Sequence, residues 1–404
     1  MFDFLQQRVG ALTDKTSLLV SVLGMLPLSR LIAPARGWKG RPAKDRQALA
    51  TAFLAKAILG LQTTRQLLER LQVDRPLRYL CGWNSPEAVP HESTFSRAFA
   101  EFSASELPQH LHEAIIKDAY QKDMPTSPLV GHIARDSTAI EVRERFPEQT
   151  EQRTARQNKH TRTKGTRTNK KKPQKHLKAK PIAKRKRGPP KKSDSTLSAK
   201  RLHRQRRQTL AEMMTELPLQ CNIGVKTSSK GYQSHWRGYK LHIVVADGQI
   251  PISCVLTAAS LHDSQLAIPL SHMTAARVTS LYVLMDSAYD AKDIREHCGS
   301  LGQVPLIDPV QGDVPLTYRT QQESLRGYDK RRKLPKTIAR KTLGFTSAQE
   351  GRYKLRTMSE RVNARLKDEL GGRTTRVRGA SKVIAHLMFG IIALTVDQLL
   401  RLAG

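Results

Sequence analysis

The stretch of sequence that decides the fold reads Leu281-Tyr-Val-Leu-Met-Asp286-Ser-Ala-Tyr-Asp290. A short apolar run followed at once by a carboxylate is typical of a buried strand in an open α/β sheet, where the strand ends project polar residues into a crevice. Two strands around an Asp-Gly turn are predicted before it, at 238–248 and 250–259. A helix over 291–298 and a strand over 303–307 are predicted after it. This alternation predicts a mixed α/β domain.

A second carboxylate lies earlier in the chain, in the run Leu129-Val-Gly-His-Ile-Ala-Arg-Asp136-Ser-Thr-Ala-Ile-Glu-Val. The pattern predicts a strand that leads to Asp136 and then a second strand. Asp136 could serve a catalytic site, or it could cap a turn with Ser137. A helix is expected further on, over residues 263–275.

A third carboxylate lies in a stretch that reads as one helix, Tyr353-Lys-Leu-Arg356-Thr-Met-Ser-Glu360-Arg-Val-Asn-Ala-Arg-Leu-Lys367. At about 100° per residue, Tyr353, Arg356, Glu360 and Lys367 fall within an arc of about 60° on one helix face. That layout suits a carboxylate that binds a divalent metal between cations that hold phosphates. A solvated face of salt bridges would also give a Glu with Arg and Lys at helical spacing.

The helix resembles the Y-(2)-R-(3)-E-(6)-K signature of bacterial insertion-sequence DDE transposases, with every spacing met. The segments "RDST" at Asp136 and "LMDSAYD" at Asp286 look like the two aspartate segments of that family, and "GYKLH" and "SLHDS" look like further landmarks. The resemblance covers roughly residues 45–404. It implies a ribonuclease-H-like catalytic core in which Asp136, Asp286 and Glu360 form the catalytic triad.

The resemblance also implies a cofactor of two Mg²⁺ or Mn²⁺ ions, hard cations that prefer oxygen ligands. Asp136 would bridge the ions, and Asp286 and Glu360 would complete one shell each. Arg356 and Lys367 would bind DNA phosphates, and Tyr353 would hydrogen-bond a phosphate or stack on a base. These statements are expectations drawn from the family.

Other chemistries find less support in the residues. Asp290 competes with Asp286, which we favour because it directly follows the apolar run, and Asp263 is a reserve candidate that could instead cap a helix. A hydrolase built on Ser137 or Ser264 would lack the G-x-S-x-G elbow. The sequence contains no G-x-x-x-x-G-K-[ST] loop, so we expect no nucleotide cofactor.

The charge of the chain predicts a nucleic-acid partner. Its formal net charge is +34, a surplus that repels itself unless a polyanion neutralises it. We expect no membrane partner, because the apolar run at 17–29 is too short to span a bilayer. The four cysteines are far apart with no C-x-x-C pair. They indicate buried thiols in a reducing bacterial cytoplasm, where the protein would associate with the nucleoid.

Most of the excess charge lies in one segment. Residues 151–210 contain 23 Lys and Arg against two acids, so this segment carries +21 of the +34. It has almost no large apolar residues and cannot bury enough surface to offset its ordering entropy. We expect a mostly disordered insert that clamps DNA through its phosphates, with a solubilising loop as the alternative.

The N-terminal third reads as a series of helices, over 45–59, from Thr63 or Thr64 to Gln72, and after His91 with Ser93 as the cap. It suits a helix-turn-helix module that reads a major groove, and it suits equally a helical packing or dimerisation domain. The runs "AKAILGLQTTRQLLERL" and "HESTFSRAF" also resemble the helical domain that precedes the catalytic core in this kind of transposase.

The predicted organisation is therefore a helical N-terminal domain at 1–125, a catalytic domain at 126–150 and 211–404, and a basic insert at 151–210. The predicted function is that of a transposase that cuts the ends of an insertion sequence and joins them to target DNA. Its partner would be double-stranded DNA, and the family resemblance implies a homodimer in the DNA complex. The alternatives are a non-catalytic DNA-binding protein and a metal-dependent nuclease without strand transfer.

Overall fold

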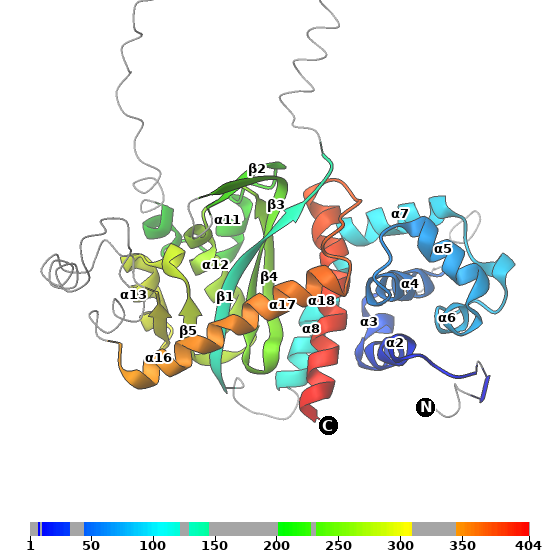
Figure 1. Cartoon of the computed structure of the whole chain (residues 1–404), viewed down its shortest axis with the longest axis horizontal. Coiled ribbons are helices and arrows are strands. Elements are labelled where there is room, and N and C mark those ends of the chain that lie inside the picture. The colour runs from blue at the N-terminus through cyan, green and yellow to red at the C-terminus, as the bar shows by residue number, and fades with distance from the viewer. Residues whose placement is uncertain are drawn as a thin grey trace, which may run out of the picture.

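The computed structural model describes residues 7–8, 10–32, 44–121, 129–144, 201–227, 232–308 and 345–403. Within them the chain forms a helical N-terminal region and a mixed β-sheet with helices on both faces (Figure 1). The predicted mixed α/β class, with helices ahead of the sheet, is confirmed.

Six strands form a single sheet. They are β1 (Leu129–Glu141), β2 (Asn222–Thr227), β3 (Gln233–Ala246), β4 (Ile250–Ala258), β5 (Thr279–Met285) and β6 (Val304–Ile307). The order is β2-β3-β1-β5-β6. Strand β2 pairs with the first part of β3, and β4 pairs with the part of β3 that follows. The first four strands are joined by antiparallel pairs, whereas β5 and β6 run parallel to β1.

Strand β1 corrects one prediction. The sequence predicted two strands separated at Asp136, but β1 is a single strand of 13 residues with Asp136 near its middle. Its antiparallel pairing with β3 continues without a break from Ile133 to Glu141, and Asp136 is opposite Ile243. The hydrogen-bonded ladder therefore overrides the low strand propensity of an aspartate.

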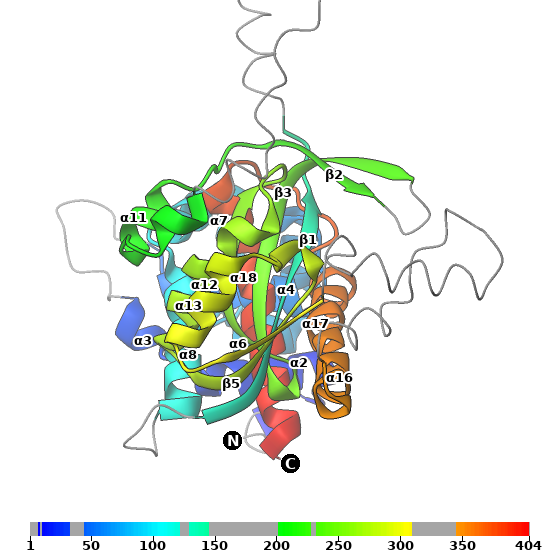
Figure 2. The ribbon, with the colours of Figure 1, turned by 90° about the vertical axis from the view of Figure 1, so that its left-hand side faces the viewer.

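Two hydrophobic clusters cover the two faces of the sheet. The strand β3 shows the alternation, since Leu241, Ile243 and Val245 belong to one cluster and Val244 and Ala246 to the other. The first face packs against α17 (Thr357–Asp368) and α18 (Ala380–Ala403). The second packs against α11 (Leu210–Thr215), α12 (Ala267–Ala275) and α13 (Lys292–Ser300), as Figures 1 and 2 show.

The N-terminal helices pack mainly on α18, and the last of them also contacts the sheet through the His112 ring, which hydrogen-bonds the Pro251 carbonyl of β4 at 3.0 Å. They are α2 (Asp14–Met25), α3 (Leu28–Leu31), α4 (Arg46–Ile58), α5 (Thr64–Val73), α6 (Arg75–Leu80), α7 (Glu92–Ala104) and α8 (Leu107–Gln121). Helix α18 contacts β4 on one side and α2, α4 and α7 on the other, so it lies between the two parts (Figure 1). Among the described helices, α18 alone is long and apolar enough to cross a membrane. Because 78% of its apolar window is buried in the fold, it is the central core helix.

The predicted helices at 45–59, 63–72 and after His91 correspond to α4, α5 and α7. Thr63 caps α5 through a capping box. The Thr63 side chain accepts from the Gln66 backbone N–H, and the Gln66 side chain accepts from the Thr63 backbone N–H. The cap of α7 differs from the prediction. The His91 ring accepts from the backbone N–H of Ser93, so His91 replaces Ser93 as the capping residue.

The predicted basic insert lies largely outside the described residues, which resume at 201. Residues 201–205 are helical and pack on the second face of the sheet, where Leu202 and Gln205 are buried. The Arg201 guanidinium donates to the Gln265 side chain at 2.8 Å, and Arg206 pairs with Asp293 at 3.3 Å. The last ten residues of the predicted insert therefore belong to the folded core.

Candidate active site

The register of the sheet brings two of the predicted acids to the same level. Parallel pairing of β1 with β5 runs from Leu129 opposite Thr279 to Ala134 opposite Leu284. The same offset, continued by two residues, joins Asp136 to Asp286. Neighbouring strands lie about 4.8 Å apart, so the backbones of the two aspartates are on adjacent strands of the sheet. Asp286 directly follows β5, as predicted, and its carboxylate accepts from the Ala288 backbone N–H at 3.0 Å.

The Asp136 carboxyl group lies in a strongly perturbed environment. Burial first, and then the negative charges of Asp286 and Glu360, raise its pKa from 3.8 to about 6. The Ser137 backbone N–H and the Arg356 guanidinium act in the opposite direction. Asp286 and Glu360 are therefore within electrostatic reach of Asp136. The Asp136 carboxyl group is protonated more readily than an ordinary aspartate.

The predicted single helix at 353–367 contains a tighter turn. Helix α16 (Ser347–Tyr353) passes through a 3₁₀ turn at Lys354–Arg356 into α17. Glu360 lies in the first turn of α17, where its side chain is half exposed and forms an ion pair with Arg356. The solvated salt bridge that the spacing also allowed is therefore present, and it joins the predicted metal ligand to the predicted phosphate ligand.

Tyr353 lies inside the protein, at the start of this turn. The residue is 5% exposed, and its hydroxyl donates to the Met285 backbone carbonyl at 3.0 Å. Met285 is the last residue of β5 and precedes Asp286. Tyr353 thus ties the helical segment to the strand that carries the second acid, and its predicted contact with DNA stays a prediction.

Lys367 lies in the last turn of α17, away from Glu360 in the first turn, and it is near the end of β1. Burial and the neighbouring charges of Arg373 and Lys226 lower its pKa, and Glu141 acts in the opposite direction. Glu141 is five residues beyond Asp136 on β1, which is about 16 Å along an extended strand. The structure therefore brings Arg356 and Glu360 to Asp136, and it places Lys367 further along β1.

The rival carboxylates are held by cations. Asp290 accepts from the Arg295 guanidinium at 2.7 Å. Asp263 pairs with the Lys240 ammonium at 2.9 Å, and the pKa of Asp263 is lowered because nearby His242 and Lys240 favour its charged form over the opposing effect of burial. The predicted cap at Asp263 is supplied by its neighbour His262, whose ring accepts from the Ser264 backbone N–H.

Three residues near the acids were missed by the sequence analysis. The Asn363 amide donates to the Asp136 carboxylate at 3.1 Å, and its own buried oxygen has no partner among the described residues. The buried Tyr289 hydroxyl is likewise without a hydrogen bond there. Asp308 follows β6 at the level of Asp286 and is buried. The signals were present, because Asn363 is one helical turn beyond Glu360 and Asp308 follows a strand.

The chemistry of the site fits a hard divalent cation. Carboxylate oxygens and the unpartnered amide oxygen of Asn363 are the ligand types that Mg²⁺ and Mn²⁺ prefer. A bound cation would also offset the burial of the Asp136 carboxylate and its repulsion by the other acids, which together raise the pKa of Asp136. In the described part of the chain, no three His, Cys, Asp or Glu side chains are grouped closely enough to hold an ion as they now lie. Glu360 is turned toward Arg356, so it would have to exchange that partner.

Two comparisons with protein families agree with this geometry. Residues 194–396, which are 203 of the 404, match the family model described as the transposase DDE domain. Residues 7–101 match the model described as transposase domain (DUF772). No curated protein matches the sequence. These matches define a protein with a DDE-type transposase domain. The chain belongs to the insertion-sequence DDE transposases.

The matched regions leave Asp136 between them, because β1 precedes residue 194. Its link to the family region is structural, since β1 pairs with β3 on one side and with β5 on the other. Members of this family generally use divalent metals and bind DNA, and both properties extend to this chain at that level of description.

Proposed function

We propose that the protein cleaves the ends of an insertion sequence and transfers the strands to target DNA, with Asp136, Asp286 and Glu360 as the catalytic carboxylates. The observation that carries this proposal is the register of β1 with β5, which places Asp136 level with Asp286, under a helix whose Glu360 acts on Asp136. The cation partners of Asp290 and Asp263 favour Asp286 as the second acid.

The order of the strands supports a ribonuclease-H-like core. Taken without β2, the sheet runs β4-β3-β1-β5-β6, which is third, second, first, fourth and fifth along the chain. Three antiparallel strands are followed by two parallel ones with helices between them. We assign this core to residues 129–144 and 201–403. The N-terminal helices would form a second unit, and residues 151–200 would form a DNA-binding insert.

The triad would hold two Mg²⁺ or Mn²⁺ ions, with Asn363 as a neighbouring oxygen donor. When bound, these ions would activate the attacking oxygen and stabilise the leaving oxygen in an in-line displacement at phosphorus. The residues of the chain then position the DNA. Asn363 holds the Asp136 carboxylate through its amide, and Tyr353 fixes the end of β5 ahead of Asp286.

Arg356 has a double role in this proposal. In the structure, its guanidinium pairs with Glu360. A DNA phosphate carries a permanent charge and can accept two parallel hydrogen bonds from a guanidinium, so the arriving strand would take Arg356 from Glu360. Glu360 would then be available to a metal ion. Because two ends are joined in one reaction, we also propose a homodimer in the complex with double-stranded DNA.

The test is strand cleavage and joining on a labelled duplex that carries the terminal sequences of the element. Wild type would be compared with Glu360→Gln, in Mg²⁺ and in EDTA. Glu369→Gln is the matched control, because Glu369 pairs with Arg365 four residues earlier, as Glu360 pairs with Arg356. We expect joined products from wild type and Glu369→Gln in Mg²⁺ only, and a loss of at least 10³-fold in Glu360→Gln.

Two results would contradict the proposal. Cleaved but never joined products would indicate a nuclease without strand transfer. Equal activity of Glu360→Gln and wild type, or DNA binding without cutting in both proteins over a range of ends and metals, would show that these carboxylates are not catalytic.

A further inference from the structure

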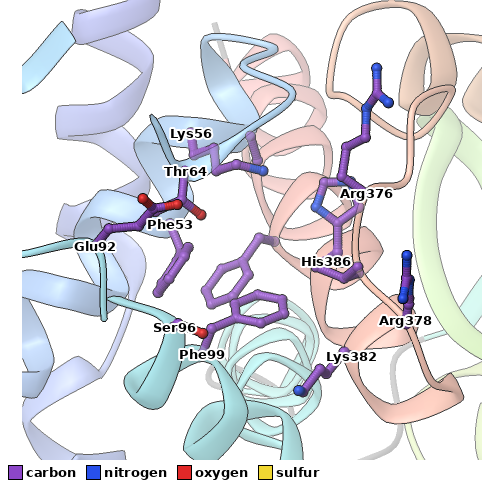
Figure 3. A pocket seen from close by; sticks show the side chains of 13 residues that line it. Phe53, Lys56, Thr64, Glu92, Ser96, Phe99, Arg376, Arg378, Lys382 and His386 are labelled. Atoms are coloured by element: carbon purple, nitrogen blue, oxygen red, sulfur yellow. The ribbon is translucent and has the colours of Figure 1, made fainter. Parts of the chain in front are cut away.

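A pocket separate from the carboxylates lies where the N-terminal helices meet the segment before α18 (Figure 3). Its volume is about 430 Å³, within the range of ligand-binding clefts. Helices α4, α5 and α7 supply one wall, and residues 376–389 supply the other. The two walls belong to different regions of the chain, which match the two transposase family models.

Lys56 on α4 is the most unusual residue of this pocket. It is 8% exposed, yet none of the ion pairs or hydrogen bonds found among the described residues involves its ammonium group. In Figure 3 its nitrogen points into the pocket, toward His386 and Arg376. A buried charge without a partner is costly, and such charges are normally paired. Burial lowers the pKa of Lys56 to about 8. The pocket therefore contains a cation that lacks an anion.

The rest of the lining adds positive charge. Arg376, Arg378 and Lys382 surround the mouth and have no ion pair with any described residue. The single acid of the lining, Glu92, is already paired with Arg65 at 3.1 Å. Four cations thus face one carboxylate that has another partner, a formal surplus of three charges. A pocket of this composition selects an anion that bears several acceptor oxygens.

The interior of the pocket is apolar. Phe53, Phe99 and Phe389 lie against one another in it, with Phe53 and Phe389 stacked at 5.8 Å between ring centroids. His386 is buried beside them, and burial together with the charge of Lys56 lowers its pKa to about 4, so the ring is neutral. Charges above an apolar floor suit an anion that is attached to an organic group, as a phosphate is attached to a sugar.

The pocket is connected to the catalytic sheet through the end of β1. Val142 forms a bridge with Thr375, and the Gly379 backbone N–H donates to the Glu144 carboxylate at 2.6 Å. These contacts hold the segment that carries Arg376 and Arg378. Val142 is six residues beyond Asp136, which is about 20 Å along an extended strand. Lys367 lies between them, near Glu141. Lys367 is therefore a cation between the acids and the pocket.

We propose that this pocket binds a backbone phosphate of the DNA away from the scissile phosphodiester, with Lys56 as its central ligand. The proposal rests on the proposed function in one respect, namely that DNA is the substrate. It adds a contact that the catalytic carboxylates do not need, and it gives the junction of the N-terminal helices with α18 a role in holding DNA.

The test measures DNA binding by the full-length protein in EDTA, so that no cleavage is required. Lys56→Met removes the ammonium and keeps a stem of similar shape in an apolar site, so we expect no loss of folding stability. A double variant, Arg376→Gln with Arg378→Gln, changes exposed residues only. Lys292→Met is the matched control, because Lys292 is highly exposed and lies on α13, on the opposite face of the sheet.

We expect Lys56→Met to weaken binding about tenfold, since a hydrogen bond to a charged group is lost. The slope of the logarithm of affinity against the logarithm of salt concentration should fall in magnitude by about 0.9, as one phosphate contact is lost. The double variant should lower both quantities, and Lys292→Met should change neither. Affinity and slope equal to wild type in both pocket variants would overturn the proposal.

A second arm separates a DNA phosphate from a free anion. Thermal unfolding of the protein without DNA would be compared in inorganic phosphate and in chloride at equal ionic strength. Stabilisation by phosphate that Lys56→Met abolishes, together with unchanged DNA binding, would mean that the pocket holds a small anion, and the DNA contact would be refuted. Failure of the cleavage test with a Lys56-dependent DNA affinity would refute the proposed catalysis alone.

Discussion

The buried hydroxyl of Tyr353 separates two explanations of this residue. The family resemblance implies a contact with DNA, whereas the structure places the hydroxyl on the Met285 carbonyl at 3.0 Å. Tyr353→Phe removes that hydrogen bond and leaves the ring in place. The Met285 carbonyl would keep a second donor, the Asp308 backbone N–H at 3.2 Å, so it would not be left without a partner. We therefore expect the free energy of unfolding to fall by about 1 kcal/mol.

Urea unfolding followed by circular dichroism would measure this change, and fluorescence anisotropy with a labelled duplex would measure DNA affinity in EDTA. We expect an affinity within about twofold of wild type. Tyr232→Phe provides the matched control, because Tyr232 is 75% exposed and precedes β3. The reasoning is refuted if Tyr353→Phe keeps wild-type stability and binds DNA about tenfold more weakly, since that pattern indicates a lost phosphate contact.

Three further predictions concern other parts of the molecule. Burial lowers the pKa values of His112 to about 3 and of His242 to about 4, so the unfolded chain takes up protons first as pH falls below 6.5. Protonation of these two histidines in the unfolded chain should remove about 3 kcal/mol of folding stability by pH 5.5. Urea unfolding at each pH would measure this loss, and a constant stability would contradict the prediction. Asn363→Leu removes the donor to Asp136 and an oxygen beside it, so calorimetry should show Mn²⁺ bound about tenfold more weakly, and unchanged affinity would argue against a role in the site. Deletion of residues 151–200 should reduce the slope of the logarithm of DNA affinity against the logarithm of salt concentration by about 0.9 for each lost phosphate contact. Metal-dependent cleavage should remain measurable at low salt. An unchanged slope would exclude a DNA clamp.

The elements that were predicted correctly have strong local signals. Strand β5 is an apolar run followed by an acid, and α5 begins with a capping box. Strand β1 was divided in error at Asp136 because strand propensity is local, whereas pairing with β3 is not. Helix α18 lies outside the predicted elements, because a helix that is apolar on nearly every side shows no periodicity.

The candidate site shows the same division. The positions of Asp286 and Glu360 in their elements follow from the sequence pattern, and their grouping around Asp136 agrees with the predicted triad, whose catalytic role stays a prediction. The pairing of Glu360 with Arg356 was available from the spacing, but the spacing alone does not decide between that pair and a metal-ready arrangement. Asn363 and the inward position of Tyr353 depend on how α17 and α16 pack on the sheet, which no local pattern encodes.

The central place of α18 has a consequence for how the chain folds during synthesis. Its residues complete the hydrophobic core of the sheet and also that of the N-terminal helices. Neither part can complete its hydrophobic core until residues 380–403 have left the ribosome, although the helices at 46–104 are made long before. The early helices must therefore wait with exposed apolar surface, which favours chaperone binding or aggregation. A stop codon shortly before residue 380 should thus abolish folding of both parts, and not merely shorten one of them.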